Sequence, residues 1–293
     1  MMSRLRNIGR KHFKHMEPSG RSFEFEKSKE REAVKEKLMD LTYLPSREEI
    51  FKVFDPDALT RDDDLKDEWW HFVNDPDHRM YEILNKEYLN DFGNYLASRI
   101  KELGGTKEKP LEILELGAGD GRLAHFLKIE LDKRVTEEYK YITTDSQTWV
   151  TDRPLTGRDI DEDKRTYAVT PTFPIDYKLD ADEAMKKFNP DIVIVSWMPS
   201  KVDFTEAIRK NKSVKEYLLI GWPYDDVCGD MGKTWGVWAR YKEDEAEPTE
   251  FEKDGFEDIP LEEVSKNQIG KGFDDFYTRM CHPSETVSFR KKK

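Results

Sequence analysis

Glu115-Leu116-Gly117-Ala118-Gly119-Asp120-Gly121 connects an apolar run, residues 111–116 (LEILEL), to an amphipathic helical pattern, residues 122–132 (RLAHFLKIELD). Glycines in such a connection permit positive φ angles and let a ligand approach the backbone closely. The first turn of the following helix offers N–H groups that have no partner within the helix. We therefore expect a nucleotide-like ligand at the carboxyl end of a strand in an α/β sheet.

Strand and helix patterns alternate on the C-terminal side of this stretch. Further strands are predicted at 139–144, up to Leu179, at 192–196 and at 217–221, and further helices at 181–188 and 204–210. Repeated β-α-β units predict a doubly wound, mostly parallel, seven-stranded α/β sheet. The last part is predicted to contain a solvated loop (242–258), a helix (256–266) and a closing antiparallel pair (273–279 and 285–290).

Helical patterns without a buried strand precede residue 105. Helices are predicted at 28–40, at 46–53 with a capping box from Ser46 and Glu49, and at 78–102, and a turn-like acidic stretch at 55–68. Gly104-Gly105 is expected to end the last helix. The chain is accordingly divided into an N-terminal tail and helical extension, 1–104, serving as a lid or a docking element, and a Rossmann-like domain, 105–293.

Two cofactor classes use a glycine-rich connection of this kind. A nicotinamide fingerprint requires G-x-G-x-x-G and an acid about 20 residues later. Here Arg122 occupies the sixth position, and the acid after the second predicted strand, Asp145, lies 28 residues past Gly117. The pattern E-x-G-x-G-x-G instead resembles motif I of the class I S-adenosylmethionine-dependent methyltransferases. The resemblance covers residues 110–222 and implies S-adenosylmethionine as cofactor.

The resemblance also implies roles for single residues near the glycines. Gly117 and Gly119 would line the methionine part of the cofactor, with Ala118 between them. Glu115 would accept a hydrogen bond from the cofactor's amino group. Asp145 would bind both ribose hydroxyls, because a carboxylate offers two acceptor oxygens to a vicinal diol.

Later positions would complete the cofactor site. Ser146 and Gln147 would flank the adenine, and Asp180 and the Ala181 N–H would contact its edge. Ser196-Trp197-Met198-Pro199 would lie near the reactive methyl group, where Ser196 and Trp197 are the expected contacts. This tetrapeptide departs from the N/D-P-P-Y motif of amino-methyltransferases at its first position and has one proline in place of two, so the acceptor atom stays open.

Structural interpretations compete with several of these roles. Asp145 and Asp180 could each cap the segment that follows. Trp197 could be a pocket wall or part of the core. Trp69, Trp70 and His71 could form a lid over the cofactor or dock the extension onto the sheet. Four further tryptophans, Trp149, Trp222, Trp235 and Trp238, could form an aromatic cage or belong to the core.

No general base is assigned from sequence, and the catalytic residues stay unknown; His71, Tyr81 and Asp203 are the weak candidates. Cys228 and Cys281 are the only cysteines, and no set of His, Cys and carboxylate residues has metal-ligand spacing, so no metal is expected. The formal net charge of −12 disfavours long nucleic acids.

The chain contains no apolar run of membrane-spanning length, so no membrane partner and a cytoplasmic location are expected, although the basic first fifteen residues also resemble a mitochondrial presequence. The leading hypothesis is a methyltransferase that acts on a small molecule or a protein by in-line methyl transfer. A methyltransferase-like binding or scaffold protein is the alternative, and a dehydrogenase is the third interpretation. The oligomeric state is left open.

Overall fold

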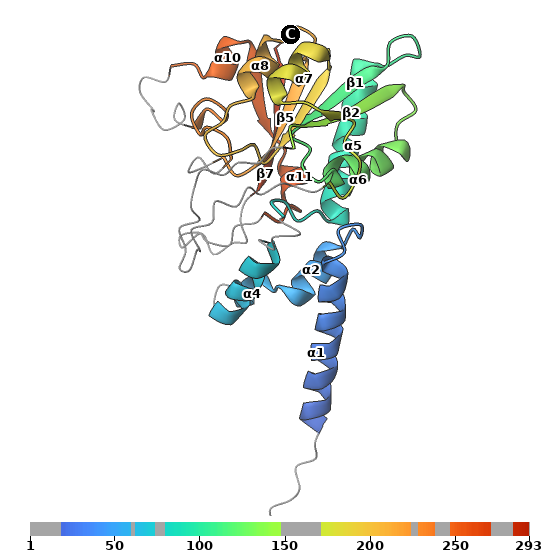
Figure 1. Ribbon diagram of the computed structural model, residues 1–293, viewed down its shortest axis with the longest axis vertical. Coiled ribbons are helices and arrows are strands. Elements are labelled where there is room, and N and C mark those ends of the chain that lie inside the picture. Colours follow the sequence, from blue (N-terminus) through green and yellow to red (C-terminus); the bar gives the residue numbers. More distant parts are fainter. Residues whose placement is uncertain are drawn as a thin grey trace, which may run out of the picture.

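The computed structural model describes residues 19–59, 62–73, 80–147, 171–223, 228–237, 247–270 and 284–292. Its strands are β1 (Leu111–Leu116), β2 (Tyr139–Asp145), β3 (Tyr177–Lys178), β4 (Ile192–Ser196), β5 (Glu216–Gly221), β6 (Phe256–Pro260) and β7 (Glu285–Lys291). They form one seven-stranded sheet in the order β3-β2-β1-β4-β5-β7-β6 (Figure 1). Parallel pairing joins β3 through β5, and β7 pairs antiparallel with both β5 and β6. The predicted doubly wound sheet with an antiparallel strand is thereby confirmed.

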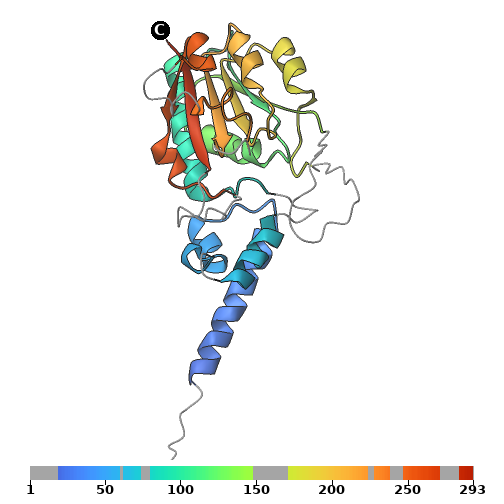
Figure 2. The same cartoon turned by 90° about the vertical axis from the view of Figure 1, so that its left-hand side faces the viewer.

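Two helical layers cover the sheet, because successive strand residues point to opposite faces. The helices are α1 (Ser19–Leu38), α2 (Arg47–Val53), α3 (Pro56–Leu59), α4 (Asp63–Val73), α5 (Lys86–Leu103), α6 (Arg122–Asp132), α7 (Ala181–Lys187), α8 (Thr205–Lys210), α10 (Glu250–Lys253) and α11 (Glu262–Ser265). Ile113 and Ile194 pack in one core with α5, α6 and α11. Leu114 and Val195 pack in the other core with α7, α8 and α10. Figure 2 shows the sheet between these layers.

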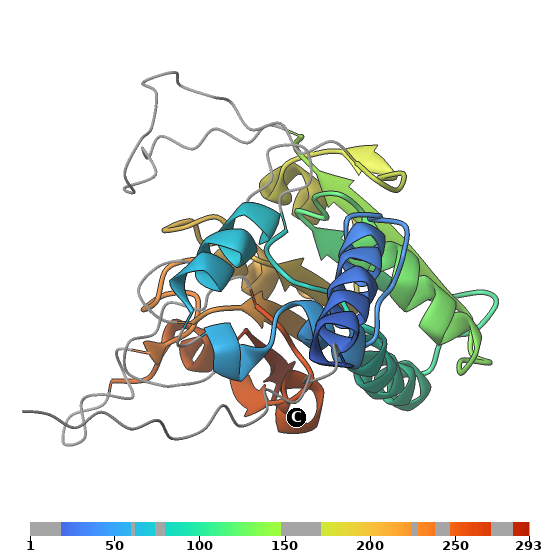
Figure 3. The ribbon, with the colours of Figure 1, turned by 90° about the horizontal axis from the view of Figure 1, so that it is seen from below.

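A third, smaller core holds the N-terminal helices together. Trp69 of α4 is 2% exposed, and its ring lies 5.0 Å from that of Phe54, centroid to centroid. Helices α1 to α4 share this core with Met80, Ile83 and Ile269. Helix α1 extends away from the sheet (Figure 1). Helices α2 and α4 lie near α1 when the molecule is seen from below (Figure 3).

The predicted division at residue 104 separates α5 from the sheet, whereas the packing groups them. Tyr88, Phe92 and Leu96 of α5 are fully buried in the same core as β1 and α6. Only α1 to α4 form a separate cluster. The physical reason is that the apolar face of α5 covers sheet residues, so α5 is one of the layers of the sheet rather than part of the extension.

Five predicted elements were wrong in their bounds or type. The helix predicted at 28–40 is α1, which begins at Ser19, and the loop predicted at 242–258 contains α10 and the start of β6. The helix predicted from residue 78 begins at Lys86, because the Asn85 side chain caps it by accepting the Tyr88 N–H at 2.9 Å. Residues 55–68, predicted as turns, contain α3 and the start of α4. Residues 256–266, predicted as a helix, begin with strand β6, since β7 offers an open edge for its pairing.

Other predictions agree closely with the structure. The capping box of Ser46 and Glu49 starts α2, and Gly104 ends α5 at a φ of +71°. The predicted strand at 273–279 lies outside the described residues. Within the described ranges, no helix is long and apolar enough to cross a membrane.

Candidate functional site

The glycine-rich connection between β1 and α6 has the backbone that its sequence predicts. Gly117, Gly119 and Gly121 have φ angles of +66°, +58° and +77°, which non-glycine residues seldom adopt. Gly121 stands at the N-cap of α6 and provides no side-chain cap. A Cβ at Gly119 would meet no heavy atom of the described residues within 4 Å. The loop therefore leaves open space beside Gly119, where a ligand can contact the backbone.

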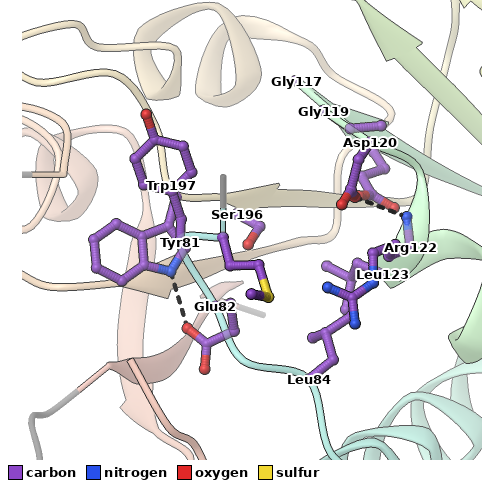
Figure 4. A pocket seen from close by; sticks show the side chains of 13 residues that line it. Tyr81, Glu82, Leu84, Gly117, Gly119, Asp120, Arg122, Leu123, Ser196 and Trp197 are labelled. Atoms are coloured by element: carbon purple, nitrogen blue, oxygen red, sulfur yellow. Dashed lines mark hydrogen bonds between the residues drawn. The ribbon is translucent and has the colours of Figure 1, made fainter. Parts of the chain in front are cut away.

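A pocket lies between this loop and the segment that joins the extension to α5 (Figure 4). Its lining is formed by Met80, Tyr81, Glu82, Leu84, Glu115, Gly117, Ala118, Gly119, Asp120, Arg122, Leu123, Ser196 and Trp197. Strands β1 and β4, which are neighbours in the sheet, both reach it with their carboxyl ends. The chain leaves β1 toward β2 on one side and returns to β4 on the other, so the pocket is at a switch point of the topology.

Six of the ten sequence-predicted cofactor residues lie together in this lining. They are Glu115 of β1, Gly117, Ala118 and Gly119 of the loop after it, and Ser196 and Trp197 at the end of β4 and just after it. Glu115 is 1% exposed and accepts a hydrogen bond from the Tyr141 hydroxyl at 2.7 Å. Burial raises the pKa of Glu115 to about 8; the Tyr141 bond opposes this shift, and Asp120 and Asp145 add to it. The pocket thus contains a carboxyl that readily gains a negative charge when a cation arrives.

Because the pKa of Glu115 is raised, we expect the free energy of unfolding to depend on pH. The folded chain keeps a proton on Glu115 up to a pH of about 8, whereas the unfolded chain loses it near the ordinary value of about 4.3. The free energy of unfolding therefore falls as pH rises across this window, by at most about 1.4 kcal/mol per pH unit for one carboxyl. Urea unfolding of Glu115→Gln at pH 5 to 8 should show a flatter pH dependence than the wild type.

The half-buried Glu112 on the same strand provides the matched control. Glu112→Gln should keep the pH slope of the wild type. Parallel curves for the wild type and Glu115→Gln would contradict the assignment of the slope to Glu115.

Asp145, at the end of β2, supports the glycine loop directly. It is 3% exposed; its Oδ2 accepts the Gly119 N–H at 2.9 Å, and its Oδ1 accepts the Gln147 N–H at 2.6 Å. Gln147 itself has a φ of +55°. Asp145 thus lies next to the loop but outside the pocket lining, with Ser146 half-buried beside it. Its contact with the ribose hydroxyls stays a prediction, which the remaining lone pairs of a carboxylate allow.

Asp180 and Ala181 begin α7, away from the pocket lining. The Asp180 side chain accepts the Glu183 N–H at 2.8 Å, and the Glu183 carboxylate accepts the Asp180 N–H in return, which makes a capping box. The structural role considered for Asp180 is therefore present. Its adenine contact stays a prediction.

Trp197 follows β4 and forms one wall of the pocket. Its φ of +50° is rare for a bulky residue. The indole Nε1 donates to Glu82 Oε2 at 2.9 Å, and the ring centroid lies 5.8 Å from that of Tyr81. Figure 4 shows Trp197, Tyr81 and Glu82 together on one side of the pocket. Backbone strain that is held in place by a side-chain hydrogen bond is typical of a functional site.

Glu82 is a pocket residue that sequence reasoning missed. Its buried carboxylate accepts from Trp197, from Ser284 and from Gln268. Burial raises its pKa to about 7, against the opposing effect of these hydrogen bonds. Residue 82 lies inside the stretch predicted as an amphipathic helix. A single glutamate in such a helix is normally interpreted as part of its solvated face. Its partners are 115 to 202 residues away in the sequence, so no local signal could have revealed it.

The remaining sequence candidates lie elsewhere or in the core. Tyr81 lines the pocket, whereas His71 is exposed on α4. Asp203 accepts from Thr205 and Thr234. Trp69 belongs to the core of the extension, and Trp235 is buried with its Nε1 donating to the Cys228 carbonyl.

Trp149, Trp238 and Cys281 lie outside the described residues, as does the side chain of Trp70. Among the described residues, no group of three or more His, Cys, Asp and Glu side chains could hold a metal ion.

Comparison with known proteins gives distant structural similarity. No protein-family model matches the sequence, and no curated protein matches it significantly. The CurJ carbon methyltransferase is 12% identical, with a TM-score of 0.39 over 95% of this chain and 72% of that one. The CMeT domain of the citrinin polyketide synthase is 11% identical, with a TM-score of 0.40 over 71% of this chain and 54% of that one.

Human N-acetylserotonin methyltransferase, solved in complex with SAM, is 13% identical, with a TM-score of 0.31 over 62% of this chain and 48% of that one. These similar structures are methyltransferases, the class that the glycine motif resembles. Because every TM-score is below 0.5, they establish neither an activity nor a substrate for this chain.

Proposed function

We propose that this chain binds S-adenosylmethionine in the pocket between β1 and β4 and transfers its methyl group to a small-molecule or protein acceptor. The observation that carries the proposal is the glycine loop. Gly119 has a positive φ and open space at its Cβ position, in a pocket that the buried Glu115 also lines. A ligand that presents a cationic amine to a carboxylate and lies against bare backbone fits this arrangement.

The charges of the pocket favour this cofactor over a dinucleotide. Three carboxyls, Glu82, Glu115 and Asp120, line it with a single cation, Arg122. A pyrophosphate would oppose ionisation of these carboxyls, whereas the sulfonium and ammonium groups of S-adenosylmethionine would favour it. The aromatic rings of Tyr81 and Trp197 on the same wall would attract a cation through their π faces.

The protein's own contribution would be alignment and exclusion of water. Bound S-adenosylmethionine supplies an already activated methyl group, so the acceptor has to be held in line with it. Trp197 and Tyr81, from β4 and the segment before α5, would form the wall against which the acceptor lies. The hydrogen bond from Trp197 to Glu82 would fix the angle of that wall.

Calorimetric titration of the purified chain with S-adenosylmethionine, S-adenosylhomocysteine and NAD tests the proposal. We expect binding of the first two and no binding of NAD. Asp145→Ala should weaken the binding of S-adenosylhomocysteine by about 10- to 100-fold, because it removes the acceptor that holds the Gly119 N–H.

Asp180→Asn keeps the helix cap of α7 and removes only the charge of the side chain. It is therefore the second variant for the same titration. A wild-type chain that binds neither sulfur compound would refute the proposal. Binding of NAD alone would favour a dehydrogenase.

A further inference from the structure

Arg122 is the first residue of α6, and its side chain lies in the pocket with 5% of the residue exposed. Figure 4 shows its guanidinium beside Leu84 and Leu123, across the pocket from Trp197 and Glu82. The guanidinium thus lies opposite Trp197 and Glu82 and on the same side of the pocket as Asp120. Arginine is seldom buried unless it is paired, so its partner has to be identified.

No described residue pairs with this guanidinium. Its Nε has no hydrogen-bond partner, and Arg122 forms no ion pair within the described ranges. Asp120 is close, but its Oδ1 accepts the backbone N–H of Arg122 at 3.0 Å rather than a side-chain N–H. Burial lowers the pKa of Arg122, and the charges of Asp120 and Asp40 oppose this shift. Among the described residues, the guanidinium therefore has no hydrogen-bonded counter-charge.

An uncompensated buried charge is strongly destabilising, and replacing it with an apolar residue of similar size commonly stabilises a protein. Retention of Arg122 is explained if a ligand supplies the counter-charge. The planar fork of a guanidinium matches a carboxylate through two parallel hydrogen bonds. A single carboxylate would satisfy the Nε that the protein leaves unpaired.

We propose that Arg122 is the carboxylate-binding residue of this pocket. The carboxylate has two sources, the amino-acid end of the bound cofactor or an acid group on the methyl acceptor, and the first of them rests on the proposed function. In either case Arg122 and the carboxyl of Glu82, which lie across the pocket from each other, would hold opposite charges of one ligand. A zwitterionic ligand would be oriented by this arrangement.

The first test needs no cofactor. Arg122→Met should leave the urea midpoint of the ligand-free protein unchanged or raise it, because the variant removes an unpaired buried charge. Sodium acetate, compared with sodium chloride at equal ionic strength, should raise the Tm of the wild type and not that of Arg122→Met. Arg209, which is buried and paired with Asp254 at 2.7 Å, provides the control: Arg209→Met should lower the urea midpoint.

The second test separates the two sources. S-adenosylhomocysteine carries the α-carboxylate, and 5′-methylthioadenosine lacks the whole amino-acid part. If the carboxylate belongs to the cofactor, Arg122→Met should weaken the binding of S-adenosylhomocysteine by about 10- to 100-fold and leave the affinity for methylthioadenosine unchanged. If it belongs to the acceptor, both nucleosides should bind the variant as they bind the wild type, while the acetate effect is still lost.

The proposal is overturned if Arg122→Met unfolds as readily as Arg209→Met, or if acetate stabilises the wild type and Arg122→Met equally. Failure of the proposed function has a different signature. In that case neither nucleoside binds the wild type, and the acetate experiment still decides the role of Arg122.

Discussion

Gly119→Asn should abolish cofactor binding. In calorimetric titration, the affinity for S-adenosylhomocysteine should fall by at least about 100-fold. Asparagine is chosen because it tolerates positive φ better than other non-glycine residues, and the φ at this position is +58°. A Cβ built on Gly119 meets no atom of the described residues within 4 Å, so the fold can accept it. The same side chain would fill the space that a ligand needs against the loop, and overlap of that kind is not relieved by small shifts in a packed site.

Gly255 provides the matched control for backbone strain. It has a φ of +83°, also has nothing within 4 Å of a Cβ, and lies in the turn before β6, away from the pocket. Gly255→Asn should lower the free energy of unfolding about as much as Gly119→Asn, by about 1 kcal/mol. Cofactor affinity should be unchanged in Gly255→Asn. Equal affinities for both variants would show that the ligand does not lie against Gly119.

Glu216→Ala should give the largest loss of stability. Glu216 lies on β5 and is completely buried; its carboxylate accepts from Arg99 Nε of α5 at 2.5 Å and from Ser288 of β7 at 2.6 Å. The Tyr95 hydroxyl also donates to it. Removing the carboxylate leaves the Arg99 guanidinium buried without its main partner. Breaking one side of such a pair costs about 3–5 kcal/mol, measured by urea unfolding.

The exposed partner of Arg99 distinguishes a buried pair from a surface pair. Glu102 is 54% exposed and bonds the same guanidinium. Because solvent screens an exposed ion pair, Glu102→Ala should cost less than about 1 kcal/mol. If Glu102→Ala and Glu216→Ala lowered the urea midpoint equally, Glu216 would not be the group that holds α5 to the sheet.

Local sequence was sufficient for the centre of the fold. The bounds of β1, β4 and α6 agree with their apolar patterns, and Gly117, Gly119 and Gly121 have the positive φ angles that a glycine-rich loop predicts. The capping of α2 by Ser46 and Glu49 could also be predicted from the sequence, because it involves residues only three positions apart. Each of these features depends on backbone propensity and on neighbours within one or two turns.

The elements that sequence reasoning missed depend on distant partners. Strand β6 exists because β7 pairs with it, although its residues also suit a helix. Residues 80–84 leave the predicted helix because the Ile83 N–H donates to the Ile269 carbonyl and Glu82 bridges to Gly270. In both cases a tertiary hydrogen bond outweighs a helix propensity that differs by well under 1 kcal/mol between ordinary residues.

The sequence alone was therefore enough to predict the parallel strands, the glycine loop and the place of the pocket at the carboxyl ends of β1 and β4, since these follow from periodicity and from the freedom of glycine. Tertiary structure alone decided the opposite walls of the pocket. Glu82 becomes a buried carboxyl only when Ser284 and Gln268 meet it. Arg122 becomes a buried, unpaired cation only when folding places it in the pocket beside Leu84 of the segment before α5. Charge and spacing are local properties of a chain, whereas burial and pairing of a charge depend on residues that folding brings from elsewhere.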